Sequence, residues 1–222
     1  MPKSAGPPAP RAMNSPRAAA VAGVLFALLF AAAIVLLRLS IPDKLEPNAD
    51  WLDEGATRRI TVALALIPFA GIAFLWFLGV IRDRFKEAED QLFSSVFMGS
   101  GLLFLAMVFV SAALAGGILA TVPLVADESS RTEVANFGRA VMLQVSNIYA
   151  LRMAGVLLIS LATMWLRTGV LPRWLAIVTY VAAAVLLIVT SVSLWVTLIF
   201  PAWVFGVSIL ILFINYRRPA AH

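Results

Sequence analysis

The chain's most distinctive polar side chain is Arg152, a cation inside the otherwise apolar stretch SNIYALRMAGVLLIS, residues 146–160. At 100° per residue, Tyr149, Arg152, Ser160 and Thr163 fall within about 80° of one another on a helix. Such a polar face indicates a helix that contacts other helices, where polar groups form hydrogen bonds. The candidates for ligand or lipid binding are the polar side chains of this segment, namely Arg152, Tyr149, Asn147, Gln144, Ser160 and Thr163.

The sequence leaves several partners open for Arg152. Counting from Arg167, it lies about 22 Å along the helix, roughly 8 Å below the outer surface of a ~30 Å hydrocarbon core. Its long stem can therefore extend to the surface. Otherwise the guanidinium meets helix carbonyls, a bound anion such as a lipid headgroup, or an outer-loop acid. Those acids are Asp53, Glu54, Asp127, Glu128 and Glu133.

The residue types that most membrane enzymes and pumps need are missing from the apolar segments. The only histidine is His222, and the chain has no cysteine. The predicted spans contain no Lys, Asp or Glu, so they offer no Schiff base, no carboxylate proton relay and no base for a serine nucleophile. We therefore expect no catalytic residues, no metal site, no cofactor and no enzymatic activity.

The composition is that of a membrane protein. Of 222 residues, 62% are hydrophobic and 13% charged, against roughly 45–50% and about 25% in soluble domains. The net charge of +5 lies in predicted loops and termini, where it sets topology and attracts lipid headgroups. Because no basic face with interleaved aromatic residues occurs, we expect no nucleic-acid binding.

The apolar runs predict an all-α polytopic membrane protein, a bundle of six transmembrane helices spanning residues 18–216. The uncharged run 174–216 is 43 residues long. At ~1.5 Å per residue it is about twice the length that one crossing needs, so it must form two spans. Residues 1–17 are predicted to be a disordered cytoplasmic tail, and 217–222 a second tail. The expected spans are 18–37, 60–81, 97–122, 141–166, 174–195 and 199–216.

The distribution of charge predicts the orientation. With both termini cytoplasmic, the inner segments hold ten cations and the outer loops six, as the positive-inside rule requires. Trp76, Trp165 and Trp174 then fall near the inner boundary, and Trp195 and Trp203 near the outer one, which predicts two aromatic belts. The expected location is the bacterial inner membrane.

Two features indicate contacts with other molecules or within the bundle. Small residues in the third span pair as Ser111 with Ala115, Ala112 with Gly116 and Ala113 with Gly117. Such pairs allow close helix packing, either inside the bundle or across a homodimer or protein–partner interface. The inner linker 82–95 is predicted to extend a helix or dock a cytoplasmic partner, and the outer loop 39–59 could cover Arg152.

The stretch WFLGVIRDRFKEAEDQLFSSVFMGSGLLFLAMVF, residues 76–109, resembles uncharacterised multi-pass membrane proteins of GC-rich bacteria, particularly actinobacteria. The resemblance covers the second and third spans with their linker. It implies an integral membrane protein and assigns no residue a chemical role.

Two functional hypotheses follow. The first is a non-enzymatic accessory or lipid-binding component of a membrane complex, with the lipid bilayer, including anionic lipid, as partner. The alternative is a small transporter or channel for an anionic or amphipathic solute, with Arg152 and Tyr149 in its pathway. A polar cavity reaching Arg152 would favour the alternative, and a dry bundle would favour the first hypothesis.

Overall fold

The structure, a computed structural model, describes residues 15–42, 51–85, 91–169, 172–188 and 194–216, and these residues form helices and their connections. The long helices are α1 (Ser15–Arg38), α2 (Glu54–Phe85), α3 (Gln91–Thr121), α4 (Glu128–Gln144), α5 (Leu151–Thr168), α6 (Arg173–Ile188) and α7 (Ile199–Tyr216). Three short elements join them: η2 (Val122–Leu124), the π-helical turn η3 (Val145–Ala150) and η5 (Leu194–Leu198).

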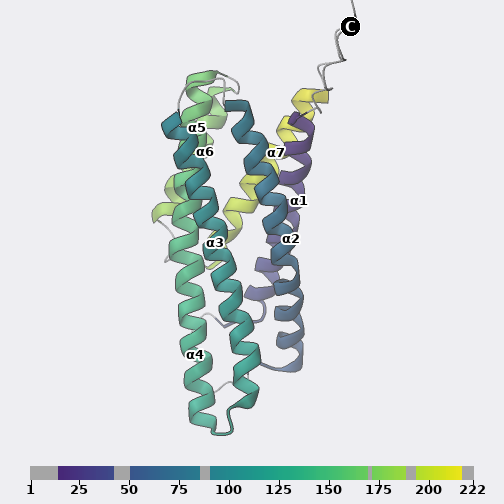
Figure 1. The fold of residues 1–222 in the computed structure, drawn as a ribbon, viewed down its shortest axis with the longest axis vertical. Helices are drawn as coiled ribbons and strands as arrows, with labels where there is room; N and C mark the ends of the chain where they lie inside the picture. The colour runs from purple at the N-terminus through teal and green to yellow at the C-terminus, as the bar shows by residue number, and fades with distance from the viewer. Residues whose placement is uncertain (1–14, 43–50, 86–90, 170–171, 189–193, 217–222) are drawn as a thin grey trace, which may run out of the picture.

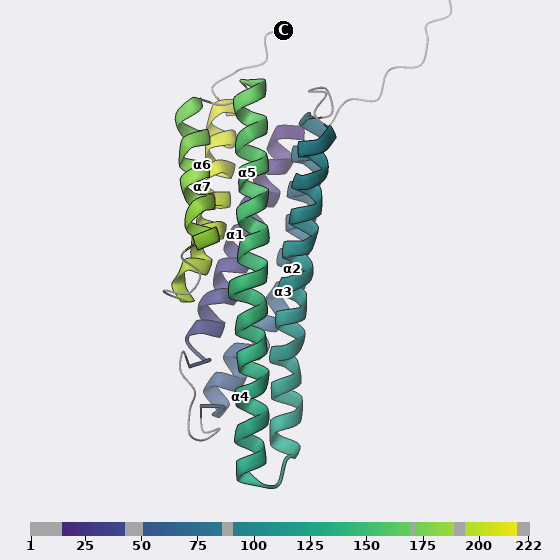
Figure 2. The same ribbon diagram turned by 90° about the vertical axis from the view of Figure 1, so that its left-hand side faces the viewer.

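The helices form an elongated bundle (Figures 1 and 2). α1 packs against α2 and α7, while α5 packs against α6 and α3. Because η3 continues the helical path, α4, η3 and α5 make one rod, Glu128–Thr168, of 41 residues. α4 and the second half of α3 form a hairpin that extends well past the end of α1 and past α6 and α7 (Figure 2). We call this hairpin, residues 112–144, the α3–α4 projection.

The predicted all-helical fold is confirmed for the described residues. Five helices are long and apolar enough to cross a membrane, and α6 is a shorter apolar helix of 16 residues. The rod Glu128–Thr168 contains the predicted span 141–166 but begins much earlier. Hydropathy identifies only its apolar half, because α4 carries Glu128, Arg131, Glu133 and Arg139.

The N-terminal cap of α4 is a local sequence signal that fixes where the projection turns. The Asp127 carboxylate accepts hydrogen bonds from the Ser130 N–H at 2.8 Å and from the hydroxyls of Ser129 and Ser130. Its side chain thus satisfies a backbone donor that a helix start leaves free. The Ser129 hydroxyl, with the Ser130 N–H and hydroxyl, lowers the pKa of Asp127 to about 2.

The core of the bundle is aromatic. Phe74 of α2 is fully buried and its ring contacts those of Phe26, Phe104 and Phe200, with centroids 4.7, 5.3 and 6.0 Å apart. These rings come from α1, α2, α3 and α7, so they hold together helices that are far apart in sequence. Tilted and edge-on ring pairs of this kind stabilise by about 0.5–1.5 kcal/mol beyond the buried area.

Two tryptophans correct the predicted aromatic belts. Trp165 and Trp203 are buried, and their rings stack with centroids 5.9 Å apart. The Trp203 indole N–H donates to the Thr179 hydroxyl at 3.0 Å. The two rings therefore belong to the core and not to belts at opposite boundaries. A buried partner for the indole N–H removes the need for water at the membrane surface.

The small residues of α3 divide between two faces. Ser111 and Ala115 are buried, and the Ser111 hydroxyl donates to the Met142 carbonyl of α4 at 3.2 Å. Ala113 and Gly117 are exposed. The first pair thus packs inside the bundle, whereas a role of the second pair in a dimer stays a prediction.

Candidate functional site

A π-helical turn lies where the α3–α4 projection meets the rest of the bundle. Such turns insert one extra residue into a helix and occur frequently at functional sites. Within it, Asn147 is buried and points toward the end of α1. Its Oδ1 accepts a hydrogen bond from Nη2 of Arg38 at 2.6 Å. The turn thus places an amide against the last residue of a helix more than a hundred positions earlier.

Two further arginines meet the segment that follows α1. Nε of Arg59, on α2, donates to the Ser40 hydroxyl at 2.9 Å. Nη1 of Arg139, on α4, donates to the Pro42 carbonyl at 2.7 Å. Because both acceptors lie within four residues of Arg38, guanidinium groups from three helices gather at one level of the bundle. We call Arg38, Arg59 and Arg139 the arginine layer.

The three arginines differ in their access to solvent. Arg38 and Arg59 are partly exposed, whereas only 4% of the Arg139 surface is accessible. In the described residues, Arg59 and Arg139 are bonded to neutral oxygens. Guanidinium groups recognise carboxylate and phosphate oxygens in particular. The layer therefore combines fixed positive charge with partial access from outside.

A small cavity of about 60 Å³ adjoins the layer on the side of the aromatic core. Its walls are mostly apolar side chains of α1 and α3, and its polar lining comes from Arg38, Ser111, Ser146 and Thr197. The volume holds a few water molecules, at ~10–15 Å³ each. It is too small for a lipid chain, and Arg152 is not among its lining residues.

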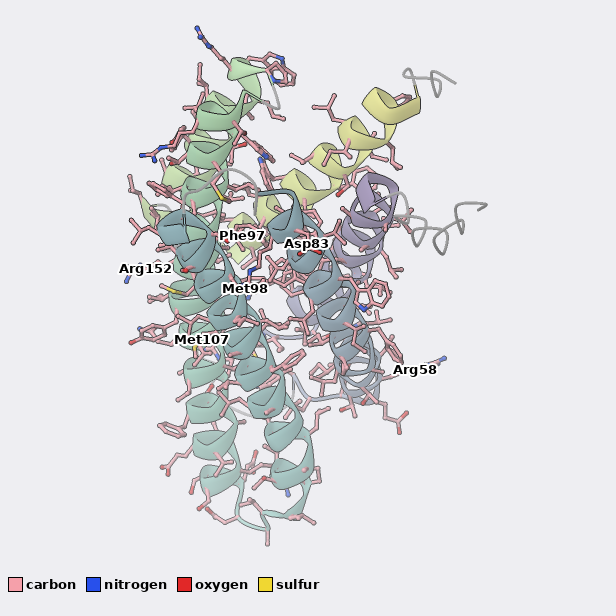
Figure 3. All side chains as sticks on the ribbon, turned by 45° about the horizontal axis from the view of Figure 1, so that its top comes forward. Arg58, Asp83, Phe97, Met98, Met107 and Arg152 are labelled. Atoms are coloured by element: carbon pink, nitrogen blue, oxygen red, sulfur yellow. The ribbon has the colours of Figure 1, made fainter. Side chains whose placement is uncertain are left out.

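The predicted bundle-facing orientation is wrong for Arg152 and Tyr149. Both side chains are exposed, Tyr149 to 54%, and Arg152 points away from the bundle (Figure 3). In the part of the chain that the structure describes, Arg152 forms no hydrogen bond or ion pair with the predicted acids or with any other residue. A cation without a partner is most stable where its head can reach water or headgroups.

The hydroxyl groups of Ser160 and Thr163 find acceptors within their own helix, and Thr163 also contacts a neighbouring helix. Ser160 donates to the Val156 carbonyl at 3.0 Å, and Thr163 to the Ile159 carbonyl at 2.8 Å. Each hydroxyl is thus satisfied within its own helix. Thr163 also lies 2.7 Å from the Tyr180 hydroxyl on α6.

The six predicted site residues therefore do not form one site. Gln144 is exposed at the end of α4, and Asn147 alone joins the arginine layer. A ligand-binding role for the six stays a prediction. In the sequence the arginines of the layer stand out only as outer cations. All three lie at the outer ends of predicted helices, and this shared position is the sequence signal that indicates they lie at one level of the bundle.

Comparisons with protein-family models, curated proteins and solved structures find no match for this chain. The fold and the site thus define its class directly. It is an all-helical protein whose long apolar helices fit a multi-pass membrane protein, with an arginine layer at one level of the bundle.

Proposed function

We propose that this chain is a non-enzymatic accessory component of a membrane complex in the bacterial inner membrane. In this proposal all six predicted spans cross the bilayer, the third with residues 97–111 and the fourth with residues 145–166, and both termini are cytoplasmic. α6, with 16 residues, is about 24 Å long, so its crossing needs flanking Arg173 and Trp174 to reach the headgroups or the bilayer to thin locally. The positive-inside count supports this orientation.

The observation that carries the proposal is the α3–α4 projection. The rod Glu128–Thr168 is about 60 Å long, twice the ~30 Å hydrocarbon thickness. Its α5 half is apolar and packs in the bundle, while the α4 half carries four charged residues. The charged half is costly to place in hydrocarbon. We therefore place the projection outside the membrane, on the side away from the termini.

Exposed apolar side chains on the projection support a docking role. Phe137 is 74% exposed and Leu124 83% exposed. Val134, 37% exposed, lies one turn before Phe137 on α4, so these two side chains form a small exposed apolar patch of the kind found at interaction sites. Exposed Glu133 lies one turn before Phe137 on the same face of α4. The surface that would cover this face is therefore apolar with a basic group opposite Glu133, and we assign it to a partner subunit with an extramembrane part.

Site-specific photo-crosslinking tests this proposal with a matched pair of phenylalanines. A photoreactive analogue at Phe137 should give a discrete protein product in cells. The same analogue at Phe69, which is 63% exposed on α2 within an apolar segment, should not. The product at position 137 should be lost when Glu133→Lys is added, because that change repels the basic group opposite it. No product at 137, or one that E133K leaves unchanged, would count against the proposal.

The alternative, a small transporter or channel using Arg152, is less well supported. A solute pathway would need a polar opening that reaches Arg152, and the cavity beside the arginine layer does not include it. Flux measured in reconstituted vesicles with Arg152→Ala separates the two ideas. The accessory role predicts unchanged flux, and transport through Arg152 predicts its loss.

A further inference from the structure

An apolar groove lies between α1 and α2 on the outside of the bundle. Its volume is about 540 Å³, within the range of ~300–1,000 Å³ typical of small-molecule pockets. None of the residues that line it is charged. They are Ala18, Val21, Ala22, Leu25, Phe69, Ile72, Ala73 and Trp76. The groove is therefore suited to an apolar ligand, and in a bilayer it faces hydrocarbon.

The groove has a floor of small side chains between two ridges of large ones. Ala22 and Ala73 are buried. Leu25 of α1 is 49% exposed, and Phe69 and Trp76 of α2 are each 63% exposed. Small residues bring two helices together when their backbones can touch at that point. Here the larger side chains rise above the alanines on both helices and hold a further helix backbone away, so the groove is better matched to a thin, flexible chain.

The groove is much shorter than a transmembrane helix. Its lining covers residues 18–25 on α1 and 69–76 on α2, about 10 Å along each helix. In the proposed orientation, Ala18 begins its span at the cytoplasmic boundary, and Phe69 lies near the middle of the span 60–81. The groove therefore occupies the cytoplasmic half of the ~30 Å hydrocarbon core. A partner helix would cross the whole core, whereas an acyl chain of one leaflet ends near its middle.

Trp76 supplies a hydrogen-bond donor at the cytoplasmic end of the groove. Its side chain is exposed, and its indole N–H forms no hydrogen bond in the part of the chain that the structure describes. Tryptophan concentrates at the membrane boundary because its ring packs on apolar groups while its N–H meets an oxygen acceptor. Near that boundary a phospholipid presents the carbonyl oxygens of its ester linkages. The groove thus places a donor at the level where an acyl chain begins.

We infer that the groove binds one acyl chain of a phospholipid from the cytoplasmic leaflet, with the Trp76 indole N–H donating to the ester carbonyl of that chain. The inference rests on the proposed membrane role, which sets the depth of the groove. Because the surrounding lipid tails are as apolar as the groove, the hydrophobic effect does not hold the chain there. Close packing against Ala22 and Ala73 and the hydrogen bond from Trp76 keep this lipid in place while neighbouring lipids exchange.

Photo-crosslinking from inside the groove identifies the occupant. The full-length protein carries a photoreactive phenylalanine analogue at Phe69 and is washed in mild detergent to remove loosely held lipid. Irradiation should give an adduct with the mass of the protein plus one phospholipid. Phe205, which is 38% exposed near the middle of α7, is the control at a similar depth and should give far less of this adduct. The inference is wrong if position 69 yields a protein product, no phospholipid adduct, or no more adduct than position 205.

Two exposed tryptophans provide matched variants for counting the retained lipid by mass spectrometry of the intact complex. Trp76→Phe keeps an aromatic ring but removes the N–H, so the retained phospholipid should fall about two- to tenfold, the factor that one neutral hydrogen bond contributes. Trp174→Phe, at a side chain 56% exposed on α6, should change the retained lipid little. Equal losses in the two variants, or no loss in W76F, would overturn the assignment of Trp76.

A variant that fills the groove tests its volume. Ala73→Leu should abolish the phospholipid adduct at position 69, because the added side-chain atoms occupy the floor of the groove. Val21→Trp, at a side chain 59% exposed on the wall, is the second variant and decides the result if A73L does not fold. An undiminished adduct in a folded filling variant would contradict the inference.

The crosslink at position 137 is measured separately from the lipid adduct at position 69. Loss of the product at 137 with an intact lipid adduct contradicts the docking role alone. Loss of the lipid adduct with an intact product at 137 contradicts the groove site alone.

Discussion

Nη2 of Arg38 donates a hydrogen bond to Oδ1 of Asn147 at 2.6 Å, and this bond joins the end of α1 to the π-helical turn between α4 and α5. The bond links the apolar bundle to the base of the α3–α4 projection. Because the donor is charged and the acceptor is buried, it is worth more than an exposed polar contact. It is therefore expected to hold the projection in a defined direction.

Asn147→Ala should destabilise the protein by about 1.5–3 kcal/mol, the usual contribution of a hydrogen bond to a charged group. The change removes the amide acceptor of Arg38 and leaves a small void. The free energy of unfolding in mild detergent measures the effect. Gln144→Ala, one turn earlier and exposed, is the control and should change it by less than about 0.5 kcal/mol. Similar changes in the free energy of unfolding for the two variants would show that the Arg38–Asn147 hydrogen bond does not stabilise the protein.

Phe74→Ala should destabilise by about 3–5 kcal/mol, because it removes a fully buried ring and leaves a cavity among three other rings. Phe69→Ala, on the same helix but 63% exposed, should have a much smaller effect. Thermal unfolding of both variants in the same detergent compares them. If F69A were the more damaging change, the burial assigned to α2 would be incorrect.

The Asp127 cap should make the start of α4 sensitive to acid. Its folded pKa of about 2 lies below the ordinary aspartate value of 3.8, so its stabilising effect is fully present above about pH 4. That effect should be lost as the pH falls from there toward 2. Amide exchange in the first turn of α4 should be faster in Asp127→Ala at pH 6, with the difference from wild type shrinking as the pH falls from 4 toward 2. A difference that is as large at pH 2 as at pH 6 would contradict this role for the carboxylate.

The sequence predicts the helices better than it predicts the site. Long uncharged runs must be helical in a membrane, since every backbone group needs an internal partner there. The direction in which a single side chain points is harder to predict from the sequence. Ser160 and Thr163 suggest a polar face that bonds to neighbouring helices, yet Ser160 bonds within its own helix and only Thr163 also bonds to another helix, at Tyr180 of α6. Trp165 and Trp203 suggest belts, yet they stack in the core.

Hydrophobic periodicity alone cannot predict that the three arginines of the layer lie close together. Arg38, Arg59 and Arg139 are far apart in sequence, and each lies outside the predicted apolar spans. Their meeting depends on α4 continuing into α5 through a π turn, which adds a residue and has no simple sequence signature. Tertiary packing therefore decides which of the flanking cations become neighbours.

Arg152→Ala should leave the unfolding temperature nearly unchanged, because the side chain is exposed and points away from the bundle. Surface changes of this kind usually alter stability by less than about 0.5 kcal/mol. A large drop in stability would show that Arg152 has a partner beyond the contacts described above.

The central claim is that the bundle crosses the membrane and carries the α3–α4 projection outside the cytoplasm. Because the chain has no cysteine, single cysteines at exposed positions 130, 173 and 181 can be tested with a membrane-impermeant thiol reagent. In intact cells we expect Ser130→Cys to react, Arg173→Cys to react only after lysis, and Val181→Cys to stay unreactive in the bilayer. Labelling of R173C but not S130C in intact cells, or free labelling of V181C, would contradict the claim.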